Sequence, residues 1–421
     1  MVSQSSTIEG EIEPQPSKYL TLLSCALASL CPNKSVLESP LVSRDTSVLA
    51  KACETIGCIL KRSQGRWSIW GVERGFTPVQ PALDLKGSET AISIMSAVAT
   101  FSKMPMVITG DHNLCRRPMP ELLESLRRIG IKIHSANPEE SPPFMNFGGT
   151  LSGGRINLRD IPHRFIPPAL LAAPFSQRKA CLLLRHDKFM FPVKSMLELM
   201  KRAGCTVRQG SSGISIQPGG YRAATYRIPK DLCSTIAFLV ASGISGSRLM
   251  VKSGKIFSER DELLIHTLRA FGMKIRYKGN WLRVEGGSLK GTRVDISWAP
   301  ELFPFIAVLS CYAKGTTRIE GASEARGMRT DRVAVILREL KRMGASALDA
   351  GDSIVVKGPC KLKGCQVDGQ GDHAVAAALT VAGLGAEGKT LIKGGADAIG
   401  AAYSKFVSTF KSLGANIGYS G

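Results

Sequence analysis

Cations that could bind a phosphate or a carboxylate are the most numerous chemically active side chains in this sequence. Lys and Arg total 55 against 34 Asp and Glu, which gives a formal net charge of +21. Such an excess is typical of proteins that bind nucleic acid or polyanionic small molecules, although a solvated basic surface gives the same number. The basic residues are spread along the whole chain, with no basic tail and no nucleic-acid reader motif. Nucleic acid therefore stays a lesser alternative to a small anionic ligand.

The Cys and His residues do not form a pattern that predicts redox or metal chemistry. The eleven Cys are scattered without a CxxC pair, and an odd count in a large chain argues against a disulfide framework. The six His form no metal signature such as HExxH. We therefore expect buried, apolar cysteines, no metal and no cofactor.

The composition predicts a globular protein with more than one domain. A chain of 421 residues exceeds the usual size of one hydrophobic core, and 44% hydrophobic with 21% charged residues is a globular balance. No run reaches the roughly 18 apolar residues of a membrane span. The polar, acidic start of the chain is unlike a targeting peptide, so a cytoplasmic location is expected.

One local pattern recurs six times: an amphipathic helix that ends in Gly, followed at once by a short alternating strand. The glycines of the six copies are 68 to 74 residues apart. The copies are CETIGCIL (53–60), LRRIGIKI (126–133), MKRAGCTV (200–207), LRAFGMKI (268–275), LKRMGASA (340–347) and FKSLGANI (410–417). This repetition predicts six modules of roughly 70 residues, which is too small for each to fold comfortably alone.

The second copy shows the physics of the pattern. Leu122, Leu126 and Ile129 recur at helical spacing and predict one buried face. Gly130 is expected to end the helix in the left-handed conformation, and Ile131 and Ile133 to point into the core from the next strand. Each module should hold a second helix as well, for example at 88–101 and at 231–242, the latter capped by Asp231.

The glycine-rich stretch 210–220, a strand at 221–228 and the Pro229–Lys230 pair follow the third copy. The simplest partition is therefore two globes of three modules each, joined near this point.

Several segments resemble motifs of the enolpyruvyl transferases, and the phosphoshikimate enzymes among them fit better than the UDP-sugar branch. The segments are PSKYLTLLSCALAS (16–29), SPLVSRDTSVLAKACETIG (39–57), VITGDHNLCRRPMPELLESLRRIG (107–130), KDLCSTIAFLVAS (230–242), TDRVAVILRELKRMGA (330–345) and GQGDHAVAAALTVAGL (369–384). The resemblance implies an α/β (α+β) fold of two globular domains, each with three βαβαββ-like repeats in an inside-out α/β barrel. It also implies that a short N-terminal piece belongs to the second globe, giving domains 13–228 and 1–12 with 229–421.

The resemblance further implies roles for individual residues in a reaction of phosphoenolpyruvate with 3-phosphoshikimate. Glu301 takes the place of a catalytic Asp, and Lys18 that of a Lys that contacts both ligands, so both are expected to be catalytic. Arg117 and Arg332 stand at arginines that contact phosphoenolpyruvate. The expected substrate-binding set is Lys18, Tyr19, Arg117, Arg164, Arg329 and Arg332.

This chain departs from the family pattern at other site positions. Tyr19 and Leu23 replace a Ser and an Arg, and Glu89 brings a carboxylate into a turn that an anionic substrate should approach. The remaining departures are Ser93 and Ala374 for arginines, Pro162-His163-Arg164 for a phosphate-binding Ser-Ser-Gln, Met328 for a Lys, and the absence of a Lys around 401–403. Each lost charged hydrogen bond is worth about 1.5–3 kcal/mol of binding energy.

Three functions remain open on the sequence alone. The first is carboxyvinyl transfer to 3-phosphoshikimate, in the shikimate pathway of aromatic amino acid biosynthesis. The second is the same transfer to a different acceptor, recognised by His163, Arg164 and Arg329. The third is a catalytically degenerate member whose basic cleft or surface binds a protein, nucleotide or nucleic acid. A monomer without a membrane partner is expected in each case.

Overall fold

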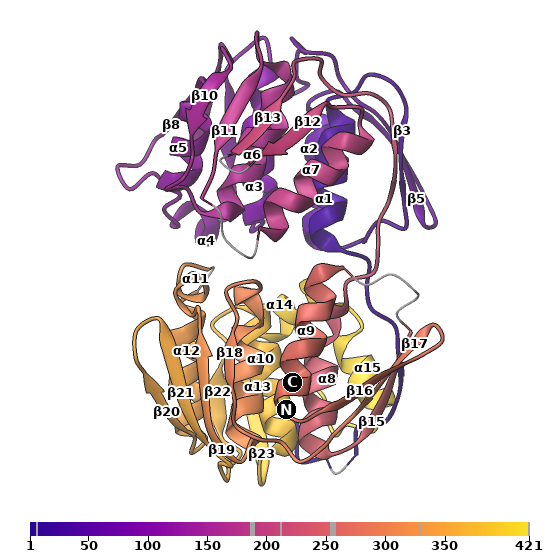
Figure 1. The fold of residues 1–421 in the computed structure, drawn as a ribbon, viewed down its shortest axis with the longest axis vertical. Helices are drawn as coiled ribbons and strands as arrows, with labels where there is room; N and C mark the ends of the chain where they lie inside the picture. The colour runs from indigo at the N-terminus through magenta and orange to yellow at the C-terminus, as the bar shows by residue number, and fades with distance from the viewer. Residues whose placement is uncertain (6, 186–189, 211–212, 253–257, 329, 420–421) are drawn as a thin grey trace. The chain divides into compact units, whose positions relative to one another are not determined.

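The computed structural model describes residues 1–5, 7–185, 190–210, 213–252, 258–328 and 330–419 (Figure 1). Its contacts divide the chain into two compact units, Pro16–Pro229 and Met1–Gln15 with Lys230–Gly421. The borders lie near the expected ones, after residues 12 and 228. That each unit folds as an independent domain stays a prediction.

Residues 16–229 carry three four-stranded sheets with one shared topology. In each, an edge strand runs parallel to the next strand, which pairs antiparallel with a two-stranded hairpin. In spatial order, the sheets are β14 (Thr225–Arg227), β3 (Ser35–Glu38), β5 (Arg66–Trp70) and β4 (Ile59–Ser63); β6 (Ala82–Asp84), β7 (Met106–Thr109), β9 (Phe144–Gly149) and β8 (Ile131–Ser135); and β10 (Gly154–Asn157), β11 (Ala180–Leu183), β13 (Gly213–Ile216) and β12 (Val207–Gly210).

The other unit repeats this topology and uses the start of the chain to complete it. Its sheets are β2 (Gly10–Ile12), β15 (Arg248–Lys252), β17 (Trp281–Glu285) and β16 (Lys274–Lys278); β18 (Arg293–Asp295), β19 (Gly315–Glu320), β21 (Ser353–Gly358) and β20 (Ser346–Asp349); and β22 (Gln366–Asp368), β23 (Lys389–Lys393) and β1 (Val2–Ser3). Strand β1 pairs antiparallel with β23, and a bridge from Val2 to Ile417 stands where the other sheets have their last strand. Both chain ends therefore lie in this unit (Figure 1).

Apolar helices form the centre of each unit. In residues 16–229, α3 (Glu89–Val98) packs against α1 (Lys18–Ser29) and α6 (Ile166–Ala172). In the other unit, α8 (Ile236–Ser245), α10 (Phe303–Tyr312) and α13 (His373–Gly385) pack against one another. Nearly all of their side chains beyond the first turn are buried. A helix that is apolar all round requires neighbours on every side, which the modules supply to one another.

The remaining helices are mostly amphipathic or short. The longer ones are α2 (Arg44–Thr55), α5 (Pro120–Arg128), α7 (Phe191–Arg202), α9 (Glu259–Ala270) and α12 (Arg332–Arg342). The short ones are α4 (His112–Cys115), α11 (Ser323–Arg326), α14 (Ala396–Ala402), α15 (Phe406–Ser412) and the 3-10 turns η1 (Ala99–Phe101), η2 (His163–Phe165), η3 (Ala173–Phe175), η4 (Leu232–Thr235) and η5 (Pro300–Leu302). No helix in these described ranges is both long and apolar enough to cross a membrane.

The predicted repeat and fold class are confirmed. All six helix-ending glycines have positive φ angles, between 81° and 109°. In β8, Ile131 and Ile133 are buried while Lys132 and His134 are exposed, as the alternation predicted. Two boundaries differ. The expected strand 221–228 shortens to β14, because only three of its residues pair with β3. The helix expected from 231 begins with the 3-10 turn η4, which Asp231 caps.

The close packing at Gly130 gives a first testable prediction. A Cβ built on Gly130 would lie 2.4 Å from the Thr150 carbonyl oxygen, whereas one on Gly65, also at positive φ, meets nothing within 4 Å. We expect Gly65→Ala to lower the free energy of unfolding by about 1–2 kcal/mol through backbone strain alone. Gly130→Ala should lower it by about 1–3 kcal/mol more, because backbone must move. Urea unfolding of both variants measures the difference, and equal losses would contradict this packing.

Candidate active site

Lys18 and Asp45 form the first ion pair at the expected site positions. Lys18 is the first residue of α1, after the helix cap Ser17, and Asp45 lies in the first turn of α2. The Lys18 Nζ atom is 2.9 Å from an Asp45 carboxylate oxygen, and both side chains are about one-third exposed. The ammonium group is therefore accessible to solvent and already has a counter-ion.

Glu89 connects two arginines from different modules. Its carboxylate lies at the first residue of α3, where the helix dipole stabilises a negative charge. Arg117 Nη1 is 2.5 Å from one carboxylate oxygen, and Arg164 Nε is 3.9 Å from the other. The Arg164 guanidinium also lies over the Phe165 ring, with 4.7 Å between its central carbon and the ring centroid. One carboxylate thus faces two guanidinium groups.

A small cavity lies beside this group. It has a volume of about 60 Å³, which is room for about two water molecules. Its lining residues are Tyr19, Glu89, Thr90, Ser93, Ile94, Arg164, Phe165, Pro167, Pro168 and Pro192. The Tyr19 ring packs against Phe191, and burial raises the pKa of its hydroxyl well above the usual value. Within the described part of the chain, the buried Tyr19 hydroxyl has no hydrogen-bond partner.

Glu301, the expected general base, pairs with Arg260 in the other unit. Glu301 lies in η5, directly before the buried helix α10, and Arg260 in the first turn of α9. Arg260 forms an ion pair with Glu301 and lies 3.7 Å from Asp231, while its own side chain is only 11% exposed. The guanidinium therefore fixes the orientation of the carboxylate that the sequence assigned to proton transfer.

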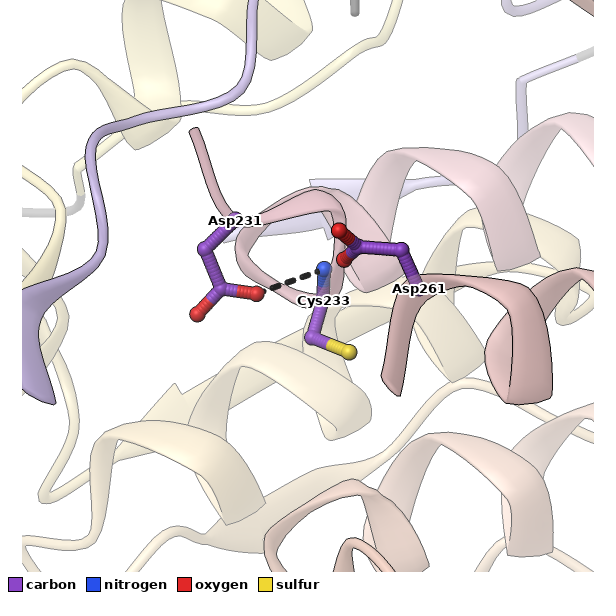
Figure 2. A group of neighbouring side chains, drawn as sticks. All are labelled: Asp231, Cys233 and Asp261. Carbon is purple, nitrogen blue, oxygen red and sulfur yellow. Dashed lines mark hydrogen bonds between the residues drawn. The ribbon is translucent and has the colours of Figure 1, made fainter. Parts of the chain in front are cut away.

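Asp231, Cys233 and Asp261 place three ligand atoms within 4.8 Å of one another, which is the spacing of a metal site (Figure 2). Their donor atoms already have other uses, however. Asp231 accepts a hydrogen bond from the Cys233 backbone N–H at 3.0 Å, as the dashed line in Figure 2 shows. Asp261 accepts from the Leu232 N–H and from both the N–H and the hydroxyl of Ser258.

The ionisation of these groups also favours a structural role. Burial raises the pKa of the Cys233 thiol, so the thiolate that a metal requires is disfavoured. We interpret the cluster as two helix caps that also neutralise Arg260. The capping role expected for Asp231 is confirmed.

Arg332 and Asp372 form the most buried ion pair of the candidate set. Arg332 Nε lies 2.8 Å from Asp372 Oδ2, and the side chains are 4% and 0% exposed. The Asp372 carboxylate also accepts from Thr330 and caps α13 through the Ala374 N–H. Burial alone would raise the pKa of Asp372, but the Arg332 charge and hydrogen bond outweigh burial and hold it at about 2. Met328 Sδ, 3.3 Å from Arg332 Nη1, covers the pair.

The structure brings only part of the expected set together. Tyr19 and Arg164 line one cavity, Arg117 meets them through Glu89, and Lys18 precedes Tyr19 in α1. Glu301 and Arg332 lie in the other unit, each in its own ion pair. His163 in η2 lies 3.3 Å from the Arg185 carbonyl oxygen. Arg329 lies outside the described residues.

Sequence reasoning missed Arg260 and the counter-ions Asp45 and Asp372, and it noted Glu89 only as a departure. Asp45 and Asp372 have the signal of acidic residues at helix starts, which local reasoning reads as caps. Arg260 sits among Glu259, Asp261 and Glu262 and reads as a solvated helix start. Only the packing of separate modules reveals these pairs.

The buried pair gives a second prediction. Asp372→Asn keeps an acceptor for the helix cap but leaves the buried Arg332 charge uncompensated, so we expect a loss of about 3–5 kcal/mol in the free energy of unfolding. Asp349→Asn in the same unit is the control, because Asp349 and its partner Arg326 are 42% and 28% exposed. That variant should lose less than about 1 kcal/mol. Urea unfolding at pH 7 measures both, and similar losses would argue against a specific role for the buried pair.

Asp261 gives a prediction for pH dependence. Burial, and secondly the negative charge of Asp231, raises the pKa of Asp261 from 3.8 to about 6. Between these values the folded protein binds a proton that the unfolded chain has released. The resulting stabilisation is complete below pH 4 and is lost as pH rises through 6, by about 3 kcal/mol in total. Asp261→Asn should lack this loss. The measurement is urea unfolding of both proteins from pH 4 to 7.5, and parallel profiles would contradict the assignment.

The chain matches known proteins over nearly its whole length. The family model described as EPSP synthase (3-phosphoshikimate 1-carboxyvinyltransferase) matches residues 2–410. A 3-phosphoshikimate 1-carboxyvinyltransferase of Methanocella arvoryzae is 30% identical over 419 residues, which cover 98% of each chain. The enzyme of the same name from Methanocaldococcus jannaschii is 29% identical over 426 residues, covering 99% of this chain and 98% of that one.

Solved structures show the same fold. An EPSP synthase from Acinetobacter baumannii superposes with a TM-score of 0.83 at 22% identity, covering 100% of this chain and 99% of that one. The enolpyruvyl transferase NikO from Streptomyces tendae gives a TM-score of 0.79 at 17% identity, covering 100% and 98%. The comparisons give no support to the catalytically degenerate alternative. By its sequence over nearly its whole length, the chain belongs to the EPSP synthase family.

Proposed function

We propose that this chain is a carboxyvinyl transferase that moves the enolpyruvyl group of phosphoenolpyruvate to a hydroxyl group of a phosphorylated acceptor, 3-phosphoshikimate. The relatives named for this reaction match the chain end to end. The observation that carries the proposal is that Arg117 and Arg164 both face Glu89 at the start of α3, in the same unit whose helix α1 begins with Lys18. Partly buried cations at such positions suit phosphate and carboxylate groups.

The reaction requires one proton acceptor and one proton donor. The acceptor hydroxyl oxygen bonds to C2 of phosphoenolpyruvate while C3 gains a proton. The C2–O bond to phosphate then breaks and C3 loses a proton, which leaves an enol ether and inorganic phosphate. We assign Glu301 to accept the hydroxyl proton and Lys18 to supply the proton to C3.

The other residues bind or position. Arg117 and Arg164, with Tyr19 beside them, are assigned to anionic groups of the substrates. Arg260 holds the Glu301 carboxylate and is therefore a positioning residue. Arg332 is buried and engaged with Asp372, so its proposed role is to order the starts of α12 and α13. A direct contact with phosphoenolpyruvate, which the resemblance implied, would require this pair to open.

Two further expectations belong to the proposal. The first is that the protein acts as a monomer, as the family resemblance implies. The shikimate-pathway substrates are small, water-soluble anions, which fits the expected cytoplasmic location.

Phosphate release tests the proposed reaction. The wild-type protein should release phosphate only when phosphoenolpyruvate and 3-phosphoshikimate are both present. We expect Glu301→Gln to lower kcat by about 10²–10⁴-fold with a smaller change in KM, because the general base is lost while substrate binding is kept. Glu301→Asp keeps the charge and should retain far more activity than Glu301→Gln.

Glu320→Gln is the matched control in the same unit, since Glu320 on β19 pairs with the exposed Arg293 on β18 and Arg318 on β19. It should leave kcat within about twofold, and melting temperatures of all variants exclude unfolding as a cause. No phosphate release by the wild type with both substrates at millimolar concentration would overturn the proposed function. Full activity of Glu301→Gln would overturn the assignment of the base.

A further inference from the structure

Glu89 occupies the guanidinium groups that a substrate anion would need. Its two carboxylate oxygens lie 2.5 Å from Arg117 Nη1 and 3.9 Å from Arg164 Nε. The Glu89 and Arg117 side chains are 26% and 16% exposed, so water screens their attraction only in part. The Glu89 carboxylate thus contacts these arginines as a bound substrate anion would.

The cavity beside Glu89 has the features of a built subsite. Apolar walls from Ile94, Phe165 and three prolines enclose a space that also meets Glu89, Arg164 and the Tyr19 residue. A buried hydroxyl without a hydrogen bond is costly, and among the described residues none partners the Tyr19 hydroxyl. Tyr19 thus brings an unsatisfied polar group to the set of residues that line the cavity.

We infer that Glu89 is a specificity-determining residue: an internal counter-ion that a phosphate or carboxylate group must displace from Arg117 and Arg164 in order to bind. This inference rests on the proposed function for the identity of the substrates. The geometry itself concerns only the competition between anions.

The competition follows from the charges present. The Glu89 carboxylate offsets one positive charge of the two guanidinium groups that it faces, and a neutral side chain at this position would not. A dianionic phosphate entering beside an ionised Glu89 is repelled by it. Binding therefore exchanges one set of charged hydrogen bonds for another, and the net affinity is the difference between them.

Glu89→Gln tests this exchange by direct binding. The amide keeps the size of the side chain but removes its charge. Isothermal titration with inorganic phosphate, and separately with phosphoenolpyruvate, should show a Kd lower by about tenfold or more than that of the wild type. Glu124→Gln is the control in the same unit, because Glu124 pairs with Arg128 on α5, away from the cavity. Its Kd values should equal those of the wild type.

A folded Glu89→Gln protein that binds both anions no more tightly than the wild type would overturn the inference. If that variant does not fold, Arg164→Gln carries the test. The inference requires Arg164 to hold the incoming anion, so the residual binding of phosphate by the wild type should weaken by about tenfold. Retention of that binding would equally overturn it.

The two proposals fail in different ways. Tighter anion binding by Glu89→Gln in a protein that never releases phosphate would sustain the role of Glu89 and reject the transferase. Turnover by the wild type, with no gain in anion binding by Glu89→Gln, would sustain the transferase and reject the role of Glu89.

Discussion

A module of about 70 residues whose central helix is apolar on all sides cannot shield that helix from water alone, so three modules must share one core. This constraint determines where polar chemistry can occur. Along α3, α10 and α13, side chains beyond the first turn are almost all buried. Only the helix starts remain available, and each start leaves backbone N–H groups without helical partners. The candidate residues therefore gather at the starts of the central helices and in the turns before them.

The same positions recur from module to module. The central-helix starts carry Lys18, Glu89, Arg164, Asp231, Glu301 and Asp372. The starts of outer helices supply partners: Asp45 to Lys18, Arg260 to Glu301 and Arg332 to Asp372. The last two pairs each join one module to the next. The ion pairs described above join five cations to five carboxylates, so the charges within these pairs balance although the chain carries +21. The net charge of the chain thus gives no measure of the charge at these helix starts.

The features that could be predicted from the sequence are those that depend on a short stretch of chain. Gly130 and its five equivalents end helices because of their own backbone freedom, and Ile131 and Ile133 alternate with polar neighbours within one strand. The motif positions of Lys18, Arg117 and Glu301 could likewise be recognised in the sequence. The ion-pair partners could not be predicted, because a pair such as Glu89 and Arg164 forms only when two modules pack together. Arg332 shows the limit most clearly. Its position at a helix start predicts an accessible cation. In the structure it is buried, with Met328 of its own module and Asp372 of the next module in contact with it.

A site whose cations already hold carboxylates differs physically from an open cationic pocket. In an open pocket, desolvated cations gain the full attraction of an incoming anion, and the empty state is costly because like charges lie unpaired. Where the cations already form ion pairs within the protein, as in Lys18–Asp45 and in Glu89 with its two arginines, the ligand-free state is stable. The free energy of ligand binding is then only the difference between the new ion pairs and the internal ones that they replace. Ground-state affinity is then modest, while any interaction that strengthens as charge develops in the transition state keeps its full effect on kcat. We therefore expect the departures of this chain from the family pattern to weaken the binding of anions first, while they leave in place the Glu301 carboxylate, which we propose as the proton acceptor.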